Sequence, residues 1–541
     1  MSSISPAPAP ARAEEIEKVL DPRHLEVAQD VTADKYSSAE DDSADILRHA
    51  GYIEFDIQED RKVLRKIDFW VLTPMMITYT LVHLDKNALS YGAVFDLQTA
   101  THLVGSQYSW LSSIIYLAQL VVQPISSFAL VKLPLAKWVT INVFCWGVCC
   151  ACMAACTNWA GLMVTRGLLG AFEATVSPTF IAVTQLWWRR REQTYRNTFW
   201  LMSSAIAGLF GPLLAFGVGH INDKIEPYQS IFIFLGCITV VLAPFLMWMM
   251  PDDIRSARFL NEREKAIAVE RLRSNNTGTK TSKWKWDQVR EAFVDPKTWM
   301  WGLMLMLLAI PSSGIGAFGG LVTKGFGFTS FQTILFQIPV SFMQGGVLLT
   351  GSWVMNKFRL RFPVVAFVTL MPIAGAIALI YVPRGNPRIL LGPYYIVQLY
   401  SPIQPLLYAW ANSNAAGTTK QRVVGGIMFI CQCAGNVAGP QVYLAKEAPI
   451  YHTGLYVDVG CWCAVFVLVL LMGGYLKYLN LRQERRREAM GRIGRMVDTS
   501  IMTLEEAAEH NQRMAQDGEA LNRHAFDDKT DFENPDFIYV L

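Results

Sequence analysis

The chain has 541 residues, of which 52% are hydrophobic and 17% are charged, and its formal net charge is +3. Because soluble domains carry roughly 25% charged residues, this composition excludes an ordinary soluble protein and favours a membrane protein. The small net charge also gives no support to a nucleic-acid-binding surface. The lipid bilayer is therefore the expected environment, and no nucleic-acid partner is expected.

The N-terminal stretch, residues 1–60, is rich in Pro and Ala and then acidic. This composition is typical of a disordered segment, which we expect in the cytosol. The stretch has no apolar core of a cleaved signal peptide, so membrane insertion is expected to begin with the first membrane helix.

Apolar runs of about 20 residues, long enough to cross a bilayer as helices, follow the N-terminal stretch. They lie at 67–88, 107–128, 136–156, 158–184, 198–219, 229–250, 298–321, 331–354, 362–382, 389–412, 422–445 and 456–479. The sequence therefore predicts an all-α membrane protein with twelve transmembrane helices in two six-helix halves, 61–250 and 298–480. A central loop at 251–297 joins the halves, and residues 481–541 form a charged C-terminal tail that we expect to be disordered apart from short helices.

Basic residues are unevenly distributed between alternate loops. The loops predicted to be cytosolic carry Lys132, Lys137, Arg189, Arg190, Arg191, Arg196, Lys357, Arg359, Arg361, Lys420, Arg422, Arg485, Arg486 and Arg487. The loops predicted to be external carry only Lys224, Lys324, Arg384, Arg388 and Lys446. Since short cytosolic loops are enriched in Lys and Arg, both termini are predicted to lie in the cytosol.

The central loop contains the segment NEREKAIAVERLRSNN, in which Ala266, Ala268, Val269 and Leu272 form a narrow apolar stripe. This pattern predicts an amphipathic helix on the inner membrane surface or against the bundle.

A faint internal repeat links the fifth and eleventh predicted helices. EQTYRNTFWLMSSAIAGLFGP, which ends at Pro212, resembles KQRVVGGIMFICQCAGNVAGP, which ends at Pro440. Two parallel halves related by an axis along the membrane normal would produce this similarity.

Two charged residues, Arg166 and Glu173, lie inside the apolar stretch TRGLLGAFEA. Seven residues are about two helical turns, so both side chains share one helix face about 10.5 Å apart along the axis. That separation is too long for a direct bond, so each charge needs another partner or a watery cavity. Charges inside a membrane mark a functional site by default, while the alternative is a structural ion pair with a neighbouring helix.

A second charged pair, Asp85 and Lys86, lies in the first predicted helix. Adjacent residues differ by about 100° around a helix, so the two side chains cannot face the same way. One division of roles directs Lys86 toward a substrate and Asp85 toward a proton path. Alternatively, Lys86 extends to the outer surface, because it lies near the predicted helix end. His83 is either a group that titrates near neutral pH or a plain polar lining residue.

The second half supplies mainly neutral polar side chains: Ser312, Ser313, Gln404, Asn412, Asn414, Gln432, Asn436 and Gln441. Gln404 and Tyr408, four residues apart on one helix face, are the best candidates there for substrate contact. Asn436 is a further candidate, and the alternative for most of these residues is packing between helices.

Gly314, Gly316 and Gly319 spell the G-x-G-x-x-G pattern of dinucleotide-binding proteins. An apolar helix precedes them in place of the strand of a βαβ unit, so we interpret them as glycines that let the seventh helix bend or break. No nucleophile–base arrangement and no nucleotide-binding loop is present. The sequence therefore predicts neither an enzyme nor a cofactor or metal site.

Several segments together resemble a known family. Twelve spans with a long central loop resemble the major facilitator superfamily. RGLLGAFEA, WWRRREQTYRNTFW, GLFGPLLAFGVGHI, ERLRSNNTG, DPKTW, KGFGF and CAGNVAGPQ more narrowly resemble the fungal allantoate permease family, which belongs to the anion:cation symporters. The resemblance covers residues 65 to 490 and leaves out both tails. The loop ALVKLPLAKW departs from the superfamily pattern, since it lacks the usual Gly and Asp.

The resemblance also implies roles for the charged residues. Related symporters of organic anions use an Asp-Arg pair in the first helix and an Arg…Glu pair in the fourth, where the arginines bind carboxylate and the acids carry protons. The matching residues are Asp85, Lys86, Arg166 and Glu173. Lys86 departs from the arginine of the family, and a lysine lacks the forked group that binds a carboxylate with two hydrogen bonds.

The sequence thus leads to the hypothesis of a monomeric, proton-coupled importer of a small organic anion in the plasma membrane. Lys86, Arg166, Gln404, Tyr408 and Asn436 would bind the substrate, and Asp85 and Glu173 would carry protons.

Two alternatives remain open. One is a proton-coupled exporter of a secondary metabolite or drug, since Gly208, Gly211 and Pro212 faintly match an antiporter motif of the fifth helix. The other is a nutrient sensor that binds without transporting.

Overall fold

The computed structural model describes most of the chain between residues 57 and 541. The described residues are 57–490, with gaps at 190–191, 194–195, 197–198, 201, 222–224, 255, 274–284, 359–360, 384–385 and 450, and then 529–541 without 536. Residues 1–56 of the predicted N-terminal tail and residues 491–528 lie outside this part. Every regular element in the described ranges is helical, in agreement with the predicted all-α class.

The first membrane helix is longer than the sequence predicted. The helix α4 (Ile57–Ile67), the π-helical turn η1 (Asp68–Leu72) and α5 (Thr73–Val94) follow one another without a break. The predicted span 67–88 therefore ends six residues early. Lys86 lies two turns inside the helix, which contradicts its expected place near the helix end.

The remaining elements of the N-terminal half overlap the predicted spans. They are α7 (Gln107–Lys132), α8 (Leu135–Met153), α9 (Trp159–Glu173), α10 (Val176–Trp187), α12 (Ser203–Val218) and α13 (Pro227–Met249), with the short α6 (Leu97–Ala100) after α5. In the central loop, α14 (Glu262–Arg273) occupies the stretch of the predicted amphipathic helix, and α15 (Trp286–Val294) follows. The apolar stripe of α14 is buried at Ala266, Ala268 and Val269. Glu264 of the same helix lies 2.7 Å from Lys66 of α4. Helix α14 therefore packs against the bundle.

The C-terminal half contains α16 (Pro296–Lys324), α17 (Ser330–Leu335), α18 (Gln337–Phe358), α19 (Phe362–Tyr381), α20 (Pro387–Val397), η3 (Gln398–Tyr400), α21 (Ile403–Ser413), α22 (Thr418–Ala438), η4 (Gly439–Val442), η5 (Ala445–Glu447) and α23 (His452–Ala489). The predicted span 389–412 is interrupted before Pro402, which has no backbone N–H to continue the helix. In contrast, α16 runs unbroken past Gly314, Gly316 and Gly319, so the expected break there is wrong.

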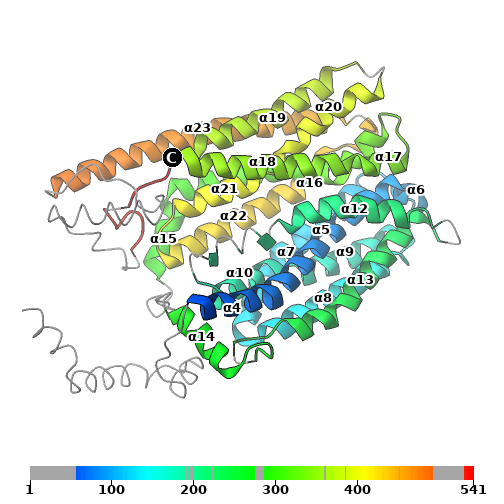
Figure 1. Cartoon of the computed structure of the whole chain (residues 1–541). Helices are drawn as coiled ribbons and strands as arrows, with labels where there is room; N and C mark the ends of the chain where they lie inside the picture. The colour runs from blue at the N-terminus through cyan, green and yellow to red at the C-terminus, as the bar shows by residue number, and fades with distance from the viewer. Residues whose placement is uncertain are drawn as a thin grey trace, which may run out of the picture.

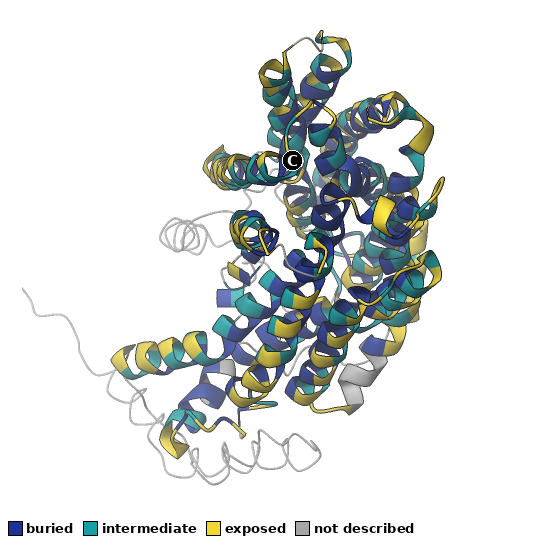
Figure 2. Ribbon diagram, turned by 90° about the vertical axis from the view of Figure 1, so that its right-hand side faces the viewer, coloured by how far each residue is buried: buried dark blue, intermediate teal, exposed yellow. Residues whose placement is uncertain are grey.

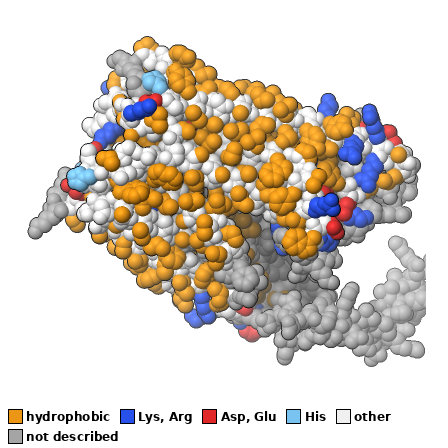
Figure 3. All heavy atoms as spheres, turned by 180° about the vertical axis from the view of Figure 1, so that it is seen from behind, with side chains coloured by type: hydrophobic (Ala, Val, Ile, Leu, Met, Phe, Trp, Pro, Cys, Tyr) orange, Lys and Arg blue, Asp and Glu red, His pale blue; other side chains and the backbone are white. Residues whose placement is uncertain are grey.

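A wide apolar surface surrounds the bundle. Nine helices of the described ranges are long and apolar enough to cross a membrane. Buried residues face the interior of the bundle and exposed residues face outward (Figure 2). On the face shown in Figure 3, hydrophobic side chains cover the middle, and Lys, Arg, Asp and Glu gather toward the ends. This arrangement matches a bilayer as the surrounding solvent.

The bundle has two distinguishable ends (Figure 1). We call the end that carries α4, α14, α15 and the C terminus the terminal end, and the end that carries α6 and α17 the opposite end. At the opposite end the two halves are in contact: Tyr108 Oη donates to Ala317 O at 2.8 Å, and Lys324 Nζ and Ser330 Oγ each donate to Val94 O at 2.8 Å. The opposite end is therefore closed in this structure.

The last residues of the chain form an ordered C-terminal segment, 529–541, which corrects the expectation of a disordered tail. Val540 forms hydrogen bonds with Trp410 of α21 and with Asn414, the residue after that helix. Tyr539 exchanges two 2.8 Å bonds with Asn480 of α23. Within the segment, Asp531 is fully buried. The segment thus binds several helices of the C-terminal half at the terminal end.

Candidate substrate and proton site

Helix α9 places Arg166 and Glu173 by packing closely on α7. Asn158 caps the helix, since its Oδ1 accepts the backbone N–H of Gly161 at 2.8 Å. A Cβ atom at Gly170 would lie 2.6 Å from the carbonyl oxygen of Ile115 in α7, so only glycine allows this approach. Both charged side chains are buried, with 2% and 4% relative exposure.

Glu173 finds its partner on another helix. Its Oε1 lies 2.7 Å from Lys86 Nζ of α5, and its Oε2 is buried without a hydrogen-bond partner among the described residues. The Lys86 side chain keeps 27% of its surface exposed. The structure therefore joins two of the predicted site residues directly, across two helices of the N-terminal half.

Arg166 lies two turns from Glu173 on the same helix and is held differently. Its Nε donates to the carbonyl oxygen of Leu111 in α7 at 3.4 Å. Its Nη1 is buried and has no hydrogen-bond partner in the described part of the chain. A buried guanidinium with an unused donor is a group that could bind an anion.

Asp85 points away from Lys86, as the 100° offset predicts. It is 1% exposed, and Cys150 Sγ of α8 donates to its Oδ1 at 3.5 Å. Its Oδ2 has no partner among the described residues. Asp85 therefore belongs to the contact between α5 and α8, while Lys86 belongs to the pair with Glu173. His83 is half-buried and lies edge-on to the ring of Tyr79, with ring centroids 4.9 Å apart.

The predicted residues of the second half lie on α21 and α22. Tyr408 Oη donates to Gln432 Oε1 at 2.7 Å, which links the two helices. Gln404 is half-buried and Asn436 is buried. A substrate that contacts Tyr408 would therefore have to share this hydroxyl with Gln432.

One buried acid escaped the sequence analysis. Asp458 of α23 has no exposed surface, accepts a 2.6 Å hydrogen bond from Tyr443 Oη through Oδ2, and leaves Oδ1 without a partner in the described ranges. The signal was available, since Asp458 is the only acid in the apolar run 456–479.

The position of Lys420 differs from expectation. Lys420, predicted as a loop charge, is 1% exposed and lies 2.7 Å from Asp531, and Lys297 pairs with the same carboxylate. Only the fold brings these groups together, because Asp531 is more than 100 residues away in sequence.

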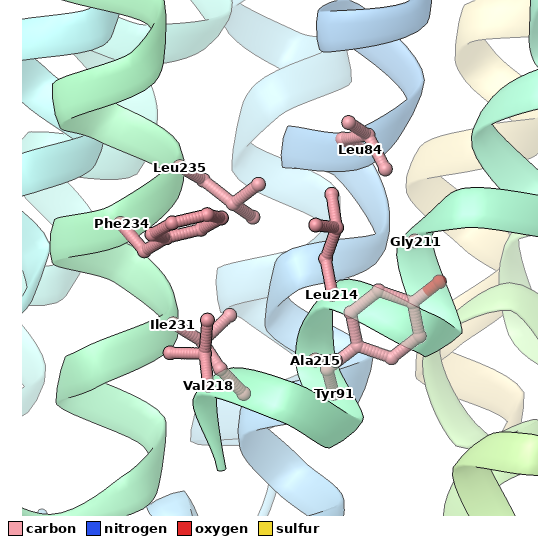
Figure 4. Close-up of a pocket in the computed structure, with 9 residues that line it drawn as sticks. All are labelled: Leu84, Tyr91, Gly211, Leu214, Ala215, Val218, Ile231, Phe234 and Leu235. Atoms are coloured by element: carbon pink, nitrogen blue, oxygen red, sulfur yellow. The ribbon is translucent and has the colours of Figure 1, made fainter. Parts of the chain in front are cut away.

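An apolar crevice between α5, α12 and α13 is a separate feature (Figure 4). It is lined by Leu84, Tyr91, Gly211, Leu214, Ala215, Val218, Ile231, Phe234 and Leu235. No charged side chain and none of the predicted site residues belongs to this lining. The crevice therefore offers nothing to hold an anion.

Comparison with known proteins identifies the family. Residues 75–440 match the Major Facilitator Superfamily. An uncharacterized transporter of Schizosaccharomyces pombe is 32% identical over 90% of this chain and 87% of its own length. The allantoate permease of Saccharomyces cerevisiae is 29% identical (93% and 90% covered), and the high-affinity nicotinic acid transporter of the same yeast is 26% identical (80% and 80%).

Solved structures agree on the fold. A bacterial homologue of the human lysosomal transporter Spinster, solved in an inward-facing conformation, aligns with a TM-score of 0.58 at 13% identity, over 77% of this chain and 96% of that one. The matched relatives are transporters and not enzymes. The chain is therefore a multi-pass membrane transporter that belongs to the major facilitator superfamily, in its fungal allantoate permease-like branch.

Proposed function

We propose that the chain imports a small organic anion together with protons, by alternating access. The observation that carries this proposal is the buried 2.7 Å pair of Lys86 and Glu173, two helical turns from a buried Arg166 with an unused donor. Two cations and one acid at this depth form a site in which proton binding and anion binding depend on each other.

The pair gives a simple coupling step. While Glu173 is ionised it holds Lys86 Nζ. A proton on Glu173 removes the negative charge and leaves Lys86 available to a substrate carboxylate, with Arg166 Nη1 as a second donor. When the proton leaves again, Glu173 regains Lys86 and the anion loses a partner. Lysine acts here as a point charge without the forked geometry of arginine.

Asp85 is the candidate for a second proton. One proton with one monoanion moves no net charge, so only the pH gradient would drive that process. A second proton would add about 2.3 kcal/mol per 100 mV of membrane potential. Asp85 is buried and accepts its hydrogen bond from Cys150, so a proton on Asp85 would leave the contact between Lys86 and Glu173 in place.

The excess of Lys and Arg supports a cytosolic terminal end. With that orientation, the closed opposite end would face the outside. The chemistry of the named relatives supports the substrate class, because allantoate and nicotinic acid are both small carboxylates. We propose the plasma membrane as the location, since uptake of such compounds requires it.

The test is uptake of labelled allantoate, nicotinate and other small carboxylates into yeast cells that lack their own carriers for them, at acidic and neutral external pH. Arg166→Gln is expected to abolish uptake while the protein remains inserted. Arg422→Gln, at an exposed position at the start of α22, is the matched control and should transport normally.

Three outcomes would contradict the proposal. Normal uptake by Arg166→Gln would remove Arg166 from the site. No uptake of any compound, with faster loss of a preloaded one, would favour an exporter, and binding without flux in either direction would favour a sensor.

A further inference from the structure

Asp458 lies outside the proposed substrate site, at the end of a chain of contacts that reaches the closed opposite end. Its carboxylate accepts the hydroxyl of Tyr443. The Tyr443 ring stacks on Phe318 of α16, with centroids 5.1 Å apart and planes 12° apart. Phe318 in turn meets the ring of Tyr108 edge-on at 5.1 Å, and Tyr108 belongs to α7 of the other half.

Tyr443 has little freedom to move within this chain. A Cβ atom at Gly314 would lie 2.5 Å from the Tyr443 ring, and one at Gly454 would lie 2.9 Å from it. Gly314 of α16 and Gly454 of α23 therefore leave the space in which the Tyr443 ring packs. This packing explains why glycine occupies position 314, which is part of the G-x-G-x-x-G pattern.

The last contact of the chain is part of the closure itself. Tyr108 Oη donates to the carbonyl oxygen of Ala317, beside Phe318, at 2.8 Å. When the halves separate at the opposite end, Tyr108 must leave both Ala317 and Phe318. Phe318 then keeps its contacts with Tyr443 and Tyr451 in its own half but loses Tyr108. We expect water from the opposite side to come closer to Asp458 once Tyr108 has left.

Among the residues that the structure describes, no cation is paired with Asp458. The titratable groups near it are Tyr443, Tyr400 and the Cys461 thiol. Helix α19, which packs along α23, has no charged residue, and α16 carries its lysines only at its two ends. An ionised carboxylate with one donor and no cation is unfavourable in such a place. A proton at Oδ1, the free position of Asp458, would remove this cost in the closed state.

We propose that Asp458 is a pH-sensitive gate residue that permits closure of the opposite end only when it is protonated, and that Tyr443, Phe318 and Tyr108 transmit its state. The proton is taken from the medium on the opposite side when that side is open, and an O–H bond forms at Oδ1. Reopening on that side returns the proton. This gate is separate from substrate coupling at Glu173, so it holds for import and export alike.

The test measures closure directly and needs no substrate. Asp96→Cys and Lys324→Cys replace an ion pair of 2.9 Å that joins the halves at the opposite end. A bifunctional, membrane-impermeant thiol reagent then reports the closed fraction in full-length protein as pH is varied. The parent without the two introduced cysteines gives the background from the native thiols.

The double-cysteine protein that keeps Asp458 is expected to show a rise in cross-linked fraction as pH falls, after correction at each pH for the thiolate fraction of its cysteines. Asp458→Asn, which resembles the protonated acid in shape, should give a high corrected fraction at every pH. Asp287→Asn, an exposed acid on α15, is the matched control and should titrate like the parent. Membrane insertion is checked for each variant by a fluorescent tag.

Either of two results would overturn the proposal: a parent whose cross-linking does not change with pH, or an Asp458→Asn variant whose cross-linking titrates as the parent does. The cross-linking assay does not depend on transport. Failure of the gate proposal can therefore be distinguished from failure of the proposed import function.

Discussion

Lys86 and Glu173 show how one buried pair can combine affinity with switching. Removing one partner of a buried ion pair leaves the other charge uncompensated, which costs about 3–5 kcal/mol. Lys86 is partly exposed and Glu173 is not, so a substrate that arrives can replace Glu173 as the partner of Lys86. In the proposed mechanism, the pair therefore makes an anion and a proton bind together.

We expect Glu173→Gln to separate substrate binding from proton use. The amide keeps the shape of the side chain and cannot be ionised, so Lys86 stays available at every pH. Binding of the labelled substrate should lose its dependence on acid, and accumulation against a gradient should disappear. Glu262→Gln, whose side chain is 90% exposed on α14, is the control and should behave as the unaltered protein. Acid-stimulated accumulation by Glu173→Gln would exclude this role.

The close packing of helix α9 on helix α7 positions Arg166 and Glu173. Gly170→Ala places a Cβ 2.6 Å from the backbone oxygen of Ile115, and a backbone atom cannot rotate away. We expect destabilisation by about 1–3 kcal/mol from overpacking, seen as a lower melting temperature in detergent and weaker substrate binding. Gly167→Ala is the matched control, since its nearest neighbour would be Ile114 Cγ1 at 3.6 Å. Equal melting temperatures for the two variants would show that the helices can separate without cost.

The C-terminal segment is held by the ionised carboxylate of Asp531. Burial disfavours this ionised form, and the two lysines Lys297 and Lys420 favour it. Desolvation tends to raise the pKa of Asp531, but Lys297 and Lys420 outweigh it and hold the pKa below the ordinary value of an aspartate. A lowered pKa means that the stabilisation is present above the ordinary pKa and is lost as pH falls through the lowered one. We therefore expect the segment to stay bound through mildly acidic pH and to detach only in strong acid.

Asp531→Ala should detach the segment at neutral pH. We expect a loss of about 3 kcal/mol, because two buried lysines lose a partner. Protease cleavage within residues 529–541 measures the detachment. Glu533→Ala, at an exposed position of the same segment, should remain protected. Protection of the Asp531→Ala segment would show that its hydrogen bonds suffice to hold it.

The approximate positions of the membrane helices could be predicted from the sequence. Bilayer thickness sets the length of a spanning helix, so an apolar run of about 20 residues indicates one. The break before Pro402 and the extension of α5 to Val94 depend on packing and were missed. The opposed directions of Asp85 and Lys86 followed from helix geometry alone. The joining of Lys86 to Glu173, and of Asp531 to Lys420, is tertiary, and no spacing in the sequence contains it.

For the whole molecule, the two halves must both touch closely and come apart. Their contacts run along α5 with α16, α7 with α22 and α12 with α18. Glycines permit the approach at two crossings: a Cβ at Gly320 would lie 2.7 Å from Val94, and one at Gly208 would lie 2.4 Å from Ser341. Gly208 faintly matched an antiporter motif. The close packing on Ser341 explains a glycine at this position without implying import or export.

Enlarging one of these glycines should favour the state in which the opposite end is open. Gly320→Leu places its side chain against Val94 and Ser90, so closure would carry an overpacking cost of about 1–3 kcal/mol. A difference of about 1.4 kcal/mol changes a population ratio tenfold. Ser90→Cys, at a position that is 7% exposed in the closed state, should then react several times faster with an impermeant thiol reagent from the opposite side.

Gly316→Leu is the matched control for this experiment, because no atom lies within 4 Å of a Cβ at that position of the same helix. It should leave the reactivity of Ser90→Cys unchanged. If Gly320→Leu also left it unchanged, the halves would be closing without the close approach of α5 and α16. The closed end would then rest on its other contacts, which include those of Tyr108, Lys324 and Ser330. Rocking of the halves could then not be governed by helix packing at this crossing.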